Sequence, residues 1–391
     1  MNMSSYESLT TGSAVSLVKK LGLFAESETL SSREIGDGNL NYVFHIKGKE
    51  KSVIVKQALP YAKVVGESWP LTLERADIEN RALRLQGKFA PDYTPKVYYS
   101  DKDLAITIME DLSHLEIART GFINGEDYPL IAQHTGEFIA RTLYSTSDFA
   151  MGPQEKKKLQ NTFCNPELCD ITEGLVFTDP FFDAETNDFE EGLRPDAEKL
   201  WQDSNLKLHT AQLKRLFLTS GDALLHGDLH TGSIFASETE TKIIDPEFAF
   251  YGPFGFDIAH FTANLFMNAL SREDSRREPL YAHIVTVWDV FNREFTRLWK
   301  ENNTEAFAKT EGYLEWLLAD IFEQAAGFMG LEMIRRTIGL AHVKDLDGIE
   351  DEAARLQAKQ RSLAIGARFV KERHQFTSAD QLVSAFQEGL Q

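Results

Sequence analysis

Four acidic residues lie close together in the sequence, at the edges of short apolar segments: Asp228, Asp245, Glu247 and Asp257. Asp228 precedes the apolar pair 234–235, and Asp245 follows a second short run, 242–244. We expect these two runs to form a hairpin closed by the polar turn 237–241. Strands of similar length would return the two carboxylates to the same end of the hairpin. Because clustered carboxylates repel one another, their convergence usually indicates a bound cation, most often magnesium together with phosphates.

Three residues around the first of these acids allow a different chemistry. His226, Asp228 and His230 alternate as metal ligands would alternate on a strand, so a zinc or iron site is an alternative. A short acidic loop, a hairpin and a second acidic turn are also the layout of a kinase catalytic loop and its metal-binding turn. A motif depends on its surroundings, and the residues on both sides favour the kinase interpretation.

Two motifs carry a family resemblance. His226-Gly227-Asp228-Leu229-His230 stands where protein kinases have His-Arg-Asp, and Asp245-Pro246-Glu247 stands where they have Asp-Phe-Gly. The chain thus resembles the kinase-like phosphotransferase superfamily that includes aminoglycoside and choline kinases. The usual small-molecule kinase loop continues Pro-Gly-Asn, whereas this chain continues Thr231-Gly232-Ser233. Together with the turn Asp-Pro-Glu-Phe-Ala-Phe-Tyr-Gly-Pro at 245–253, this pattern is similar to the methylthioribose kinases.

Length and composition limit the function classes. The 391 residues exceed one ordinary core and suggest two lobes. A net charge of −19 argues against nucleic acid or an anionic membrane as a partner. No apolar stretch reaches ~18 residues, so we expect no membrane span. The sequence holds only 2 cysteines and no secretion signal, which indicates a reduced cytoplasm.

The first hundred residues contain candidate phosphate-binding groups. Two glycines and two asparagines at 36–41 predict a tight hairpin turn. An ordinary turn would explain them equally well, but the resemblance implies backbone N–H groups over the ATP phosphates. The strand 52–57 then places Lys56 near the end of an apolar run, where kinases have their phosphate-binding lysine. Asn39 and Lys56 are therefore the predicted phosphate contacts.

A helix is predicted to follow, with Thr72 as its N-cap. Glu79 lies one position off its apolar stripe and resembles the glutamate that pairs with the kinase lysine. The alternative is a solvated surface glutamate, because charged helix residues usually face water. Between Lys56 and this helix we expect a loop, 65–70, and the resemblance places its Trp69 near the substrate.

Two more strands, 96–99 and 105–109, lead to Glu110-Asp111-Leu112-Ser113-His114. The resemblance implies that this is the hinge between two lobes. The backbone groups of Glu110 and Leu112 would then bind the adenine of ATP, while the side chains of Asp111 and His114 have no assigned role.

The rest of the chain is predicted to be mainly helical, with a turn-rich segment at 165–182. Expected helices share long apolar stripes: a first helix at 13–24, and later 197–218, 279–299, 311–343 and 348–375. Arg335 and Arg336 lie near the end of the helix 311–343, whose apolar residues include Trp316. Charge that complements the helix dipole is one explanation. A clamp for hydroxyl or phosphate oxygens is the preferred explanation.

The expected fold is α+β and protein-kinase-like. It has a small antiparallel β N-lobe with one helix (1–112) and a larger, mainly helical C-lobe (113–391). The resemblance implies an ATP-dependent kinase that phosphorylates 5-methylthioribose on its anomeric 1-hydroxyl in methionine salvage, acting as a homodimer. Another small alcohol as the substrate, and a catalytically silent nucleotide-binding scaffold, are the alternatives.

The motifs also assign individual roles. Asp228 would accept the hydroxyl proton and contact the substrate. Arg335 and Arg336 would contact the substrate as well. Asp245 and Glu247 would hold Mg²⁺ on the phosphates. The resemblance makes Asp257 a structural anchor of the catalytic loop. Ser233 stands where related kinases have an asparagine metal ligand, and being shorter it leaves that duty to Glu247. These assignments follow the general need of phosphoryl transfer for positioning and charge stabilisation.

Overall fold

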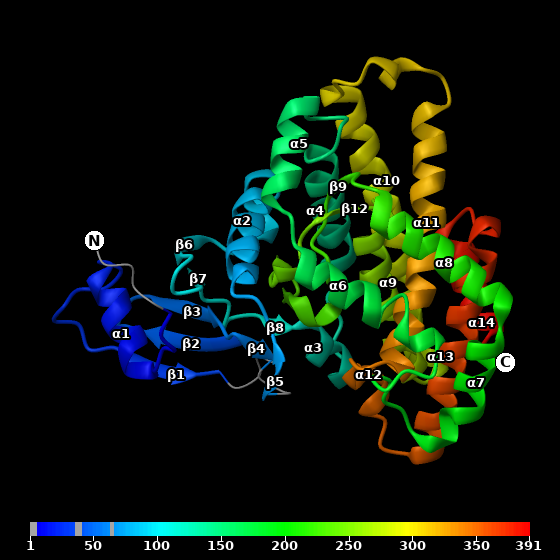
Figure 1. Cartoon of the computed structure of the whole chain (residues 1–391), viewed down its shortest axis with the longest axis horizontal. Helices are drawn as coiled ribbons and strands as arrows, with labels where there is room; N and C mark the ends of the chain where they lie inside the picture. Colours follow the sequence, from blue (N-terminus) through cyan, green and yellow to red (C-terminus); the bar gives the residue numbers. More distant parts are fainter. Residues whose placement is uncertain (1–5, 36–40, 63–65) are drawn as a thin grey trace. The chain divides into compact units, whose positions relative to one another are not determined.

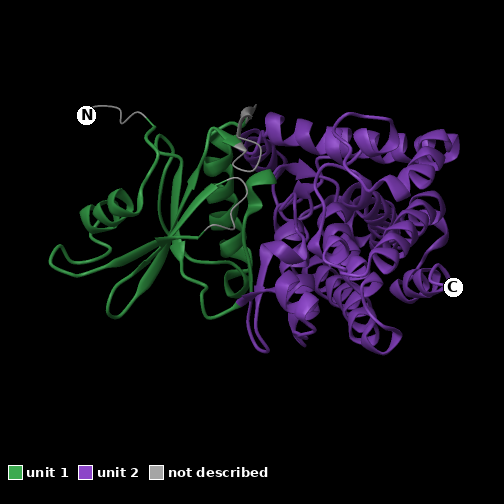
Figure 2. Ribbon diagram, turned by 90° about the horizontal axis from the view of Figure 1, so that it is seen from below, with its two compact units in different colours: residues 1–115, 242–248 green, residues 116–241, 249–391 purple. Residues whose placement is uncertain are grey.

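The structure of the chain, a computed structural model, describes residues 6–35, 41–62 and 66–391 (Figure 1). Contacts divide the chain into two compact units (Figure 2). The first unit comprises Met1–Leu115 together with Lys242–Phe248, and the second comprises Glu116–Thr241 and Ala249–Gln391. The segment Lys242–Phe248 therefore groups with the N-terminal residues, although the sequence interpretation placed it in the C-terminal domain.

The first unit is built on an antiparallel sheet with the strand order β1-β2-β3-β7-β6. The bounds of its strands are β1 Ser31–Glu34, β2 Asn41–Lys47, β3 Ser52–Ala58, β6 Val97–Asp101 and β7 Ile106–Glu110. Val53 and Val55 of β3 belong to one buried cluster with Ala14 and Val18 of α1 (Thr11–Lys20). Because side chains alternate along a strand, Lys56 points to the opposite face of the sheet.

The helix α2 (Glu74–Phe89) lies on that opposite face and supplies the partner of Lys56. Its predicted N-cap was wrong by one residue: Leu73 is the cap, although the Thr72 hydroxyl still accepts a hydrogen bond from the Glu74 N–H at 3.2 Å. The predicted loop at 65–70 is also wrong. Residues 66–70 form the short strand β5 (Gly66–Pro70), which pairs with β4 (Tyr61–Ala62). Pairing with β4 gives the backbone N–H and C=O groups of this segment hydrogen-bond partners, which favours a strand over a loop.

The second unit is mainly helical, and its helices are named here in chain order: α3 Ala118–Asn124, α4 Ile131–Ser145, α5 Pro153–Thr162, α6 Pro166–Leu175, α7 Arg194–Gln202, α8 Ser204–Thr219, α9 Gly255–Leu270, α10 Glu278–Asn302, α11 Tyr313–Ile338, α12 Lys344–Asp347, α13 Glu352–Glu372 and α14 Ala379–Glu388. Short strands lie among them: β8 Glu116–Ile117, β9 Ala223–Leu224, β10 Ile234–Ala236 and β12 Tyr251–Gly252, while β11 (Thr241–Ile243) has only Thr241 in this unit. With the first unit, they confirm the α+β class.

The helix α9 forms the centre of this unit, since every one of its residues is buried. Helices α10, α11 and α13 pack against it (Figure 1). Helices α11 and α13 approach one another at Gly330 and Gly366, where a Cβ on Gly330 would lie 2.3 Å from the Gly366 carbonyl oxygen. Only glycine permits this contact. The close packing gives the end of α11 a fixed position.

Some helix predictions need correction. The turn-rich segment 165–182 contains the helix α6, which begins with a proline at its first turn, a favoured position. The single helix expected at 197–218 is two helices, because the Asp203 side chain accepts from the Leu206 N–H at 2.8 Å and begins α8. Trp316 is 61% exposed and so does not belong to the core. None of the helices within the described residues is long and apolar enough to cross a bilayer.

Candidate active site

Lys56 lies in a buried ion-pair triad in the first unit. Its Nζ donates to Glu79 Oε1 at 2.7 Å and to Asp245 Oδ1. Glu79 is only 3% exposed, which excludes the alternative of a solvated surface glutamate. Burial raises the pKa of Glu79 to about 7, although the Lys56 charge opposes the rise. Burial by itself would lower the pKa of Lys56, but Asp245 and Glu79 raise it, so the ammonium group stays charged.

Asp245 has an unusual backbone conformation. Its φ of 63° lies in the left-handed region, which residues other than glycine rarely adopt. Its side chain is 40% exposed, whereas its partner Lys56 is buried. Strain of this kind is found preferentially at functional sites, where the surrounding structure holds it in place. Here the Lys56 ion pair and the 3₁₀ turn η5 (Pro246–Phe248) flank the strained residue.

Glu247 has a partner that the sequence analysis missed. Arg75 Nη1 donates to Glu247 Oε2 and also to Asn41 Oδ1, the latter at 2.7 Å. Arg75 is completely buried, and its Nη2 donates to the Leu59 carbonyl at 3.0 Å. The one available signal was its spacing, since Arg75 lies four residues before Glu79 and so on the same helix face.

Asp245 and Glu247 suit a magnesium ion by donor type, because both offer hard carboxylate oxygens. Within the described residues, no three His, Cys, Asp or Glu side chains form a group that could hold a metal by themselves. Mg²⁺ commonly binds through one or two carboxylates plus substrate phosphates, and two carboxylates in one short turn fit that pattern. The donor set therefore matches a metal that arrives with a nucleotide.

Asp111, which had no role in the sequence interpretation, anchors the segment after β7. Its carboxylate bonds His45 Nε2 at 2.8 Å, the Ser113 N–H at 3.0 Å and the Ser52 hydroxyl. Burial by itself would raise the pKa of Asp111, but the hydrogen bonds from Ser113, Ser52 and His45 lower it to about 2. The carboxylate thereby fixes the backbone next to Glu110 and Leu112.

The two predicted hinge residues lie at the end of β7, and part of their backbone is engaged. The Glu110 N–H donates to the Lys96 carbonyl at 2.9 Å, and the Leu112 carbonyl accepts from the Leu115 N–H at 2.9 Å. Two other predicted residues are not placed. Asn39 lies outside the described residues, and Trp69 lies in β5 with its side chain outside them.

In the second unit, Asp257 ties down the loop that contains Asp228. Its carboxylate accepts hydrogen bonds from the His226 N–H at 2.7 Å and the Gly227 N–H at 3.0 Å. Gly227 has a φ of 87°, which a glycine adopts without strain. These bonds confirm the predicted anchoring contact of Asp257, which lies in the first turn of the buried helix α9. The loop is therefore fixed to the most buried helix of the unit.

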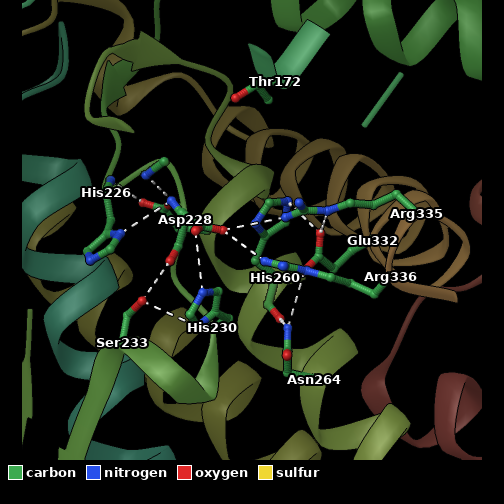
Figure 3. Close-up of polar contacts among 12 residues, drawn as sticks. Thr172, His226, Asp228, His230, Ser233, His260, Asn264, Glu332, Arg335 and Arg336 are labelled. Carbon is green, nitrogen blue, oxygen red and sulfur yellow. Dashed lines mark hydrogen bonds and ion pairs between the residues drawn. The ribbon is translucent and has the colours of Figure 1, made fainter. Parts of the chain in front are cut away.

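Asp228 lies among cationic and polar groups. Its Oδ1 accepts from Arg336 Nη2 at 3.2 Å and Arg335 Nη2 at 3.4 Å, and its Oδ2 lies 3.3 Å from His230 Nε2 (Figure 3). Burial by itself would raise the pKa of Asp228, but His230, Arg336 and Arg335 hold it well below its usual range. The carboxylate is thus ionised at neutral pH.

Glu332 makes the two arginines converge. It is fully buried, its Oε2 accepts from Arg335 Nε, and its Oε1 accepts from Arg336 Nε at 2.8 Å. Figure 3 shows both guanidinium groups extending past this carboxylate toward Asp228. Adjacent helix residues point about 100° apart, and this pair converges because both side chains hydrogen-bond the carboxylate three and four residues before them. Both arginines lie in the last turn of α11, which ends at Ile338.

The sequence analysis missed Glu332, although its spacing was a signal, since it precedes the arginines by three and four residues. Burial would raise the pKa of Glu332, but Arg335, His260 and Arg336 lower it below its usual range. Asn264 Nδ2 lies 3.4 Å from its Oε1, and His260 Nε2 lies 3.6 Å from its Oε2. An ionised, buried Glu332 carboxylate therefore holds the two guanidinium groups of this part of the site.

Ser233 and the alternating histidines do not form a metal centre among the described residues. The Ser233 hydroxyl donates to the Asp228 carbonyl at 3.2 Å and lies 3.3 Å from His230 Nδ1. Ser233 thus supports the loop that carries Asp228. The zinc or iron alternative for His226, Asp228 and His230 has no support in this geometry.

Comparison with known proteins adds evidence from the whole chain. Residues 31–299 match a family model described as "Phosphotransferase enzyme family". The methylthioribose kinase of Geobacillus sp. (strain WCH70) is 62% identical over 383 residues, 97% of this chain and 96% of that protein. The methylthioribose kinase of Geobacillus kaustophilus (strain HTA426) is 60% identical over 385 residues, 98% of this chain and 97% of that protein. A solved ethanolamine kinase of Plasmodium vivax is 14% identical, with a TM-score of 0.49 over 91% of this chain and 88% of that one.

Proposed function

This chain belongs to the phosphotransferase enzyme family, and within it to the methylthioribose kinases, and we propose that it phosphorylates 5-methylthioribose. The γ-phosphoryl group of ATP is transferred to the anomeric 1-hydroxyl, giving 5-methylthioribose 1-phosphate for methionine salvage. The observation that carries the proposal is Asp228, an ionised carboxylate beside two guanidinium groups that share Glu332. That arrangement combines a proton acceptor with donors for the hydroxyl groups of a sugar.

The first unit binds the nucleotide in this proposal. Lys56, directed by Glu79, contacts the phosphates, as does Asn39. The Glu110 carbonyl and the Leu112 N–H bind the adenine edge, since the Glu110 N–H and the Leu112 carbonyl already have partners in the chain. Asp111 keeps this short segment in place through its three hydrogen-bonded neighbours.

Asp245 and Glu247 would hold Mg²⁺ in this proposal. When bound, the ion neutralises the negative charge that builds up on the transferring phosphoryl group. The Lys56 ammonium stays paired with Asp245 and adds a second positive charge next to the phosphates. Asp245 is strained and half exposed, and Glu247 is held by Arg75, so the two carboxylates are directed before a ligand arrives. Such preorganisation lowers the cost of assembling the site during the reaction.

The second unit binds and activates the sugar. Arg335 and Arg336 donate to the sugar hydroxyls, while Asp228 orients the 1-hydroxyl and accepts its proton. An anomeric hydroxyl is more acidic than an ordinary alcohol, so a carboxylate of low pKa is a sufficient base. Trp69 of the first unit is proposed as a further substrate contact, as the resemblance implies. Phosphoryl transfer requires positioning and charge stabilisation more than covalent help, which these groups can provide.

A substrate panel with ATP and Mg²⁺, followed by phosphorus NMR of the products, tests the proposal. Methylthioribose should give a 1-phosphate signal, while choline, homoserine and an aminoglycoside should give none. A product from one of those alcohols instead would assign the chain to a kinase with a different acceptor. Absence of any phosphorylated product, with nucleotide still bound, would point to a silent scaffold. The proposal includes a homodimer acting in the cytoplasm, and light scattering of the purified chain measures the first of these properties.

A further inference from the structure

Arg75 is the most deeply buried charged residue beside the proposed metal-binding turn, with no exposed surface. Among the described residues, its guanidinium donates to acceptors from three separate segments: Asn41 Oδ1, the Leu59 carbonyl and Glu247 Oε2. Asn41 begins β2, and Leu59 directly follows β3. The planar fork of a guanidinium fixes the directions of its N–H groups, so these three acceptors are held in one geometry.

The helix α2 thereby reaches both acids of the metal turn. Glu79 pairs with Lys56, which in turn donates to Asp245. One helical turn earlier, Arg75 donates directly to Glu247. Asp245 and Glu247 are thus directed from the same face of one helix, the first through a lysine and the second through an arginine.

The charges in this region explain why an arginine is useful. Three carboxylates, those of Glu79, Asp245 and Glu247, lie among two cationic side chains, Lys56 and Arg75. Without Arg75 the nearly buried Glu247 would lose a hydrogen-bonded cation whose planar fork sets the direction of its carboxylate. An arginine stays charged under all ordinary conditions, so this cation is always present beside the carboxylate.

We propose that Arg75 is a positioning residue that orients the Glu247 carboxylate toward the magnesium–nucleotide complex, an inference that rests on the proposed function. Carboxylate ligands of metals are generally held by outer hydrogen bonds, and loss of such a partner weakens metal binding by about 10- to 100-fold. A structural salt bridge alone would affect folding without changing the dependence of nucleotide binding on Mg²⁺.

The test is calorimetric titration with ADP, with and without Mg²⁺, on the full-length wild type and the variants Arg75→Met, Arg75→Lys and Glu247→Ala. The measured quantity is the gain in ADP affinity that Mg²⁺ produces. Arg75→Met should reduce this gain about tenfold and leave metal-free ADP binding within about twofold of wild type. The double variant Arg75→Met/Glu247→Ala should lose no more of the gain than Glu247→Ala alone, because Arg75 acts through Glu247.

Arg81→Met is the matched control. Arg81 lies on the same helix and pairs with Asp77 one turn away, with a side chain that is 41% exposed. It should leave the Mg²⁺ gain unchanged. Arg75→Lys keeps the charge but lacks the fork, so it should fold and still lose most of the gain.

The proposed function and the positioning role of Arg75 would fail with different results. Wild-type protein that binds ADP equally well with and without Mg²⁺ would contradict the proposed function itself. A normal Mg²⁺ gain in folded Arg75→Lys or Arg75→Met would refute only the role of Arg75. Additive losses in the double variant would show that Arg75 does not act through Glu247.

Discussion

Arg336 Nη2 lies 3.2 Å from Asp228 Oδ1, so a residue proposed to bind the sugar is hydrogen-bonded to the proposed base. The two residues are 108 positions apart in the chain. Their contact links substrate binding to proton transfer, because the guanidinium lowers the pKa of the carboxylate that must accept the proton.

Asp228→Asn should lower kcat by about 10²- to 10⁴-fold, the range for loss of a general base. The substitution keeps the size of the side chain but removes its charge and its ability to accept the proton. Nucleotide binding should be nearly unchanged, because the groups proposed for it lie in the other unit. Steady-state kinetics and ADP titration measure the two effects. Turnover close to wild type would remove Asp228 from catalysis.

Arg335→Ala and Arg336→Ala should each raise KM for methylthioribose far more than KM for ATP. At least one loss should reach about 1.5–3 kcal/mol, the range for hydrogen bonds to charged groups. If both variants bind sugar normally and only melt at a lower temperature, the pair merely caps the helix α11 and the sugar-binding role is wrong.

Arg336→Ala should also move the acid limb of the kcat profile to higher pH. Arg336 is one of the groups that hold the pKa of Asp228 below its usual range, so removing it raises that pKa. A base with a raised pKa becomes protonated at a higher pH, and activity then falls earlier on acidification. An unchanged acid limb would show that Asp228 protonation does not limit the rate.

Glu332→Gln should weaken sugar binding and destabilise the protein together. Removing one partner of a buried ion pair typically costs about 3–5 kcal/mol, because the remaining charges stay buried. Glu332 is fully buried under two arginines, so chemical denaturation should show a loss of that order. Glu323→Gln is the control on the same helix, since that side chain is 44% exposed and should change little. Equal effects of the two substitutions would argue against a special role of Glu332.

His342 and Asp347 should stabilise the fold within a limited pH range. The His342 Nδ1 lies 2.9 Å from Asp347 Oδ2, and this hydrogen bond raises the pKa of His342. Burial would raise the pKa of Asp347, but His342 and Lys359 lower it to about 2. A histidine whose pKa is raised on folding stabilises the folded state. This contribution is complete below the pKa of about 6.5 in the unfolded chain, and it is lost as pH rises through the folded pKa. An aspartate whose pKa is lowered on folding also stabilises the folded state. This contribution is complete above the pKa of about 3.9 in the unfolded chain, and it is lost as pH falls toward 2.

The difference in Tm between wild type and His342→Gln measures this effect. It should be largest between about pH 4 and pH 6.5 and should shrink on both sides of that range. A difference that is constant from pH 5 to pH 9 would show that the ionised pair contributes nothing. Asp347→Asn, which removes the charged partner, should reduce the pH dependence of the effect of His342→Gln, while the hydrogen bond of His342 to the Asp188 carbonyl remains.

The sequence by itself determined the parts of this protein that depend on neighbours along the chain. The motif at 226–233, the turn at 245–247 and the apolar stripes of the long helices are local patterns, and they predicted the α+β fold and the kinase chemistry. The Lys56–Glu79 pair and the Asp257 anchor also followed from motifs, and the structure contains both contacts.

Only the tertiary structure decided which side chains hold these motifs in place. Arg75 and Glu247 are 172 positions apart, and an arginine on a helix is usually solvated, so no pattern indicated that it would be buried. Spacing placed Glu332 on the same helix face as the two arginines, but its burial comes from the packing of α11 against α9 and α13. Spacing along a helix gives only the face on which a side chain lies. Whether that face meets water, a carboxylate or another helix is set by packing between segments distant in sequence, and this packing decides burial, charge and the pKa values on which the chemistry depends.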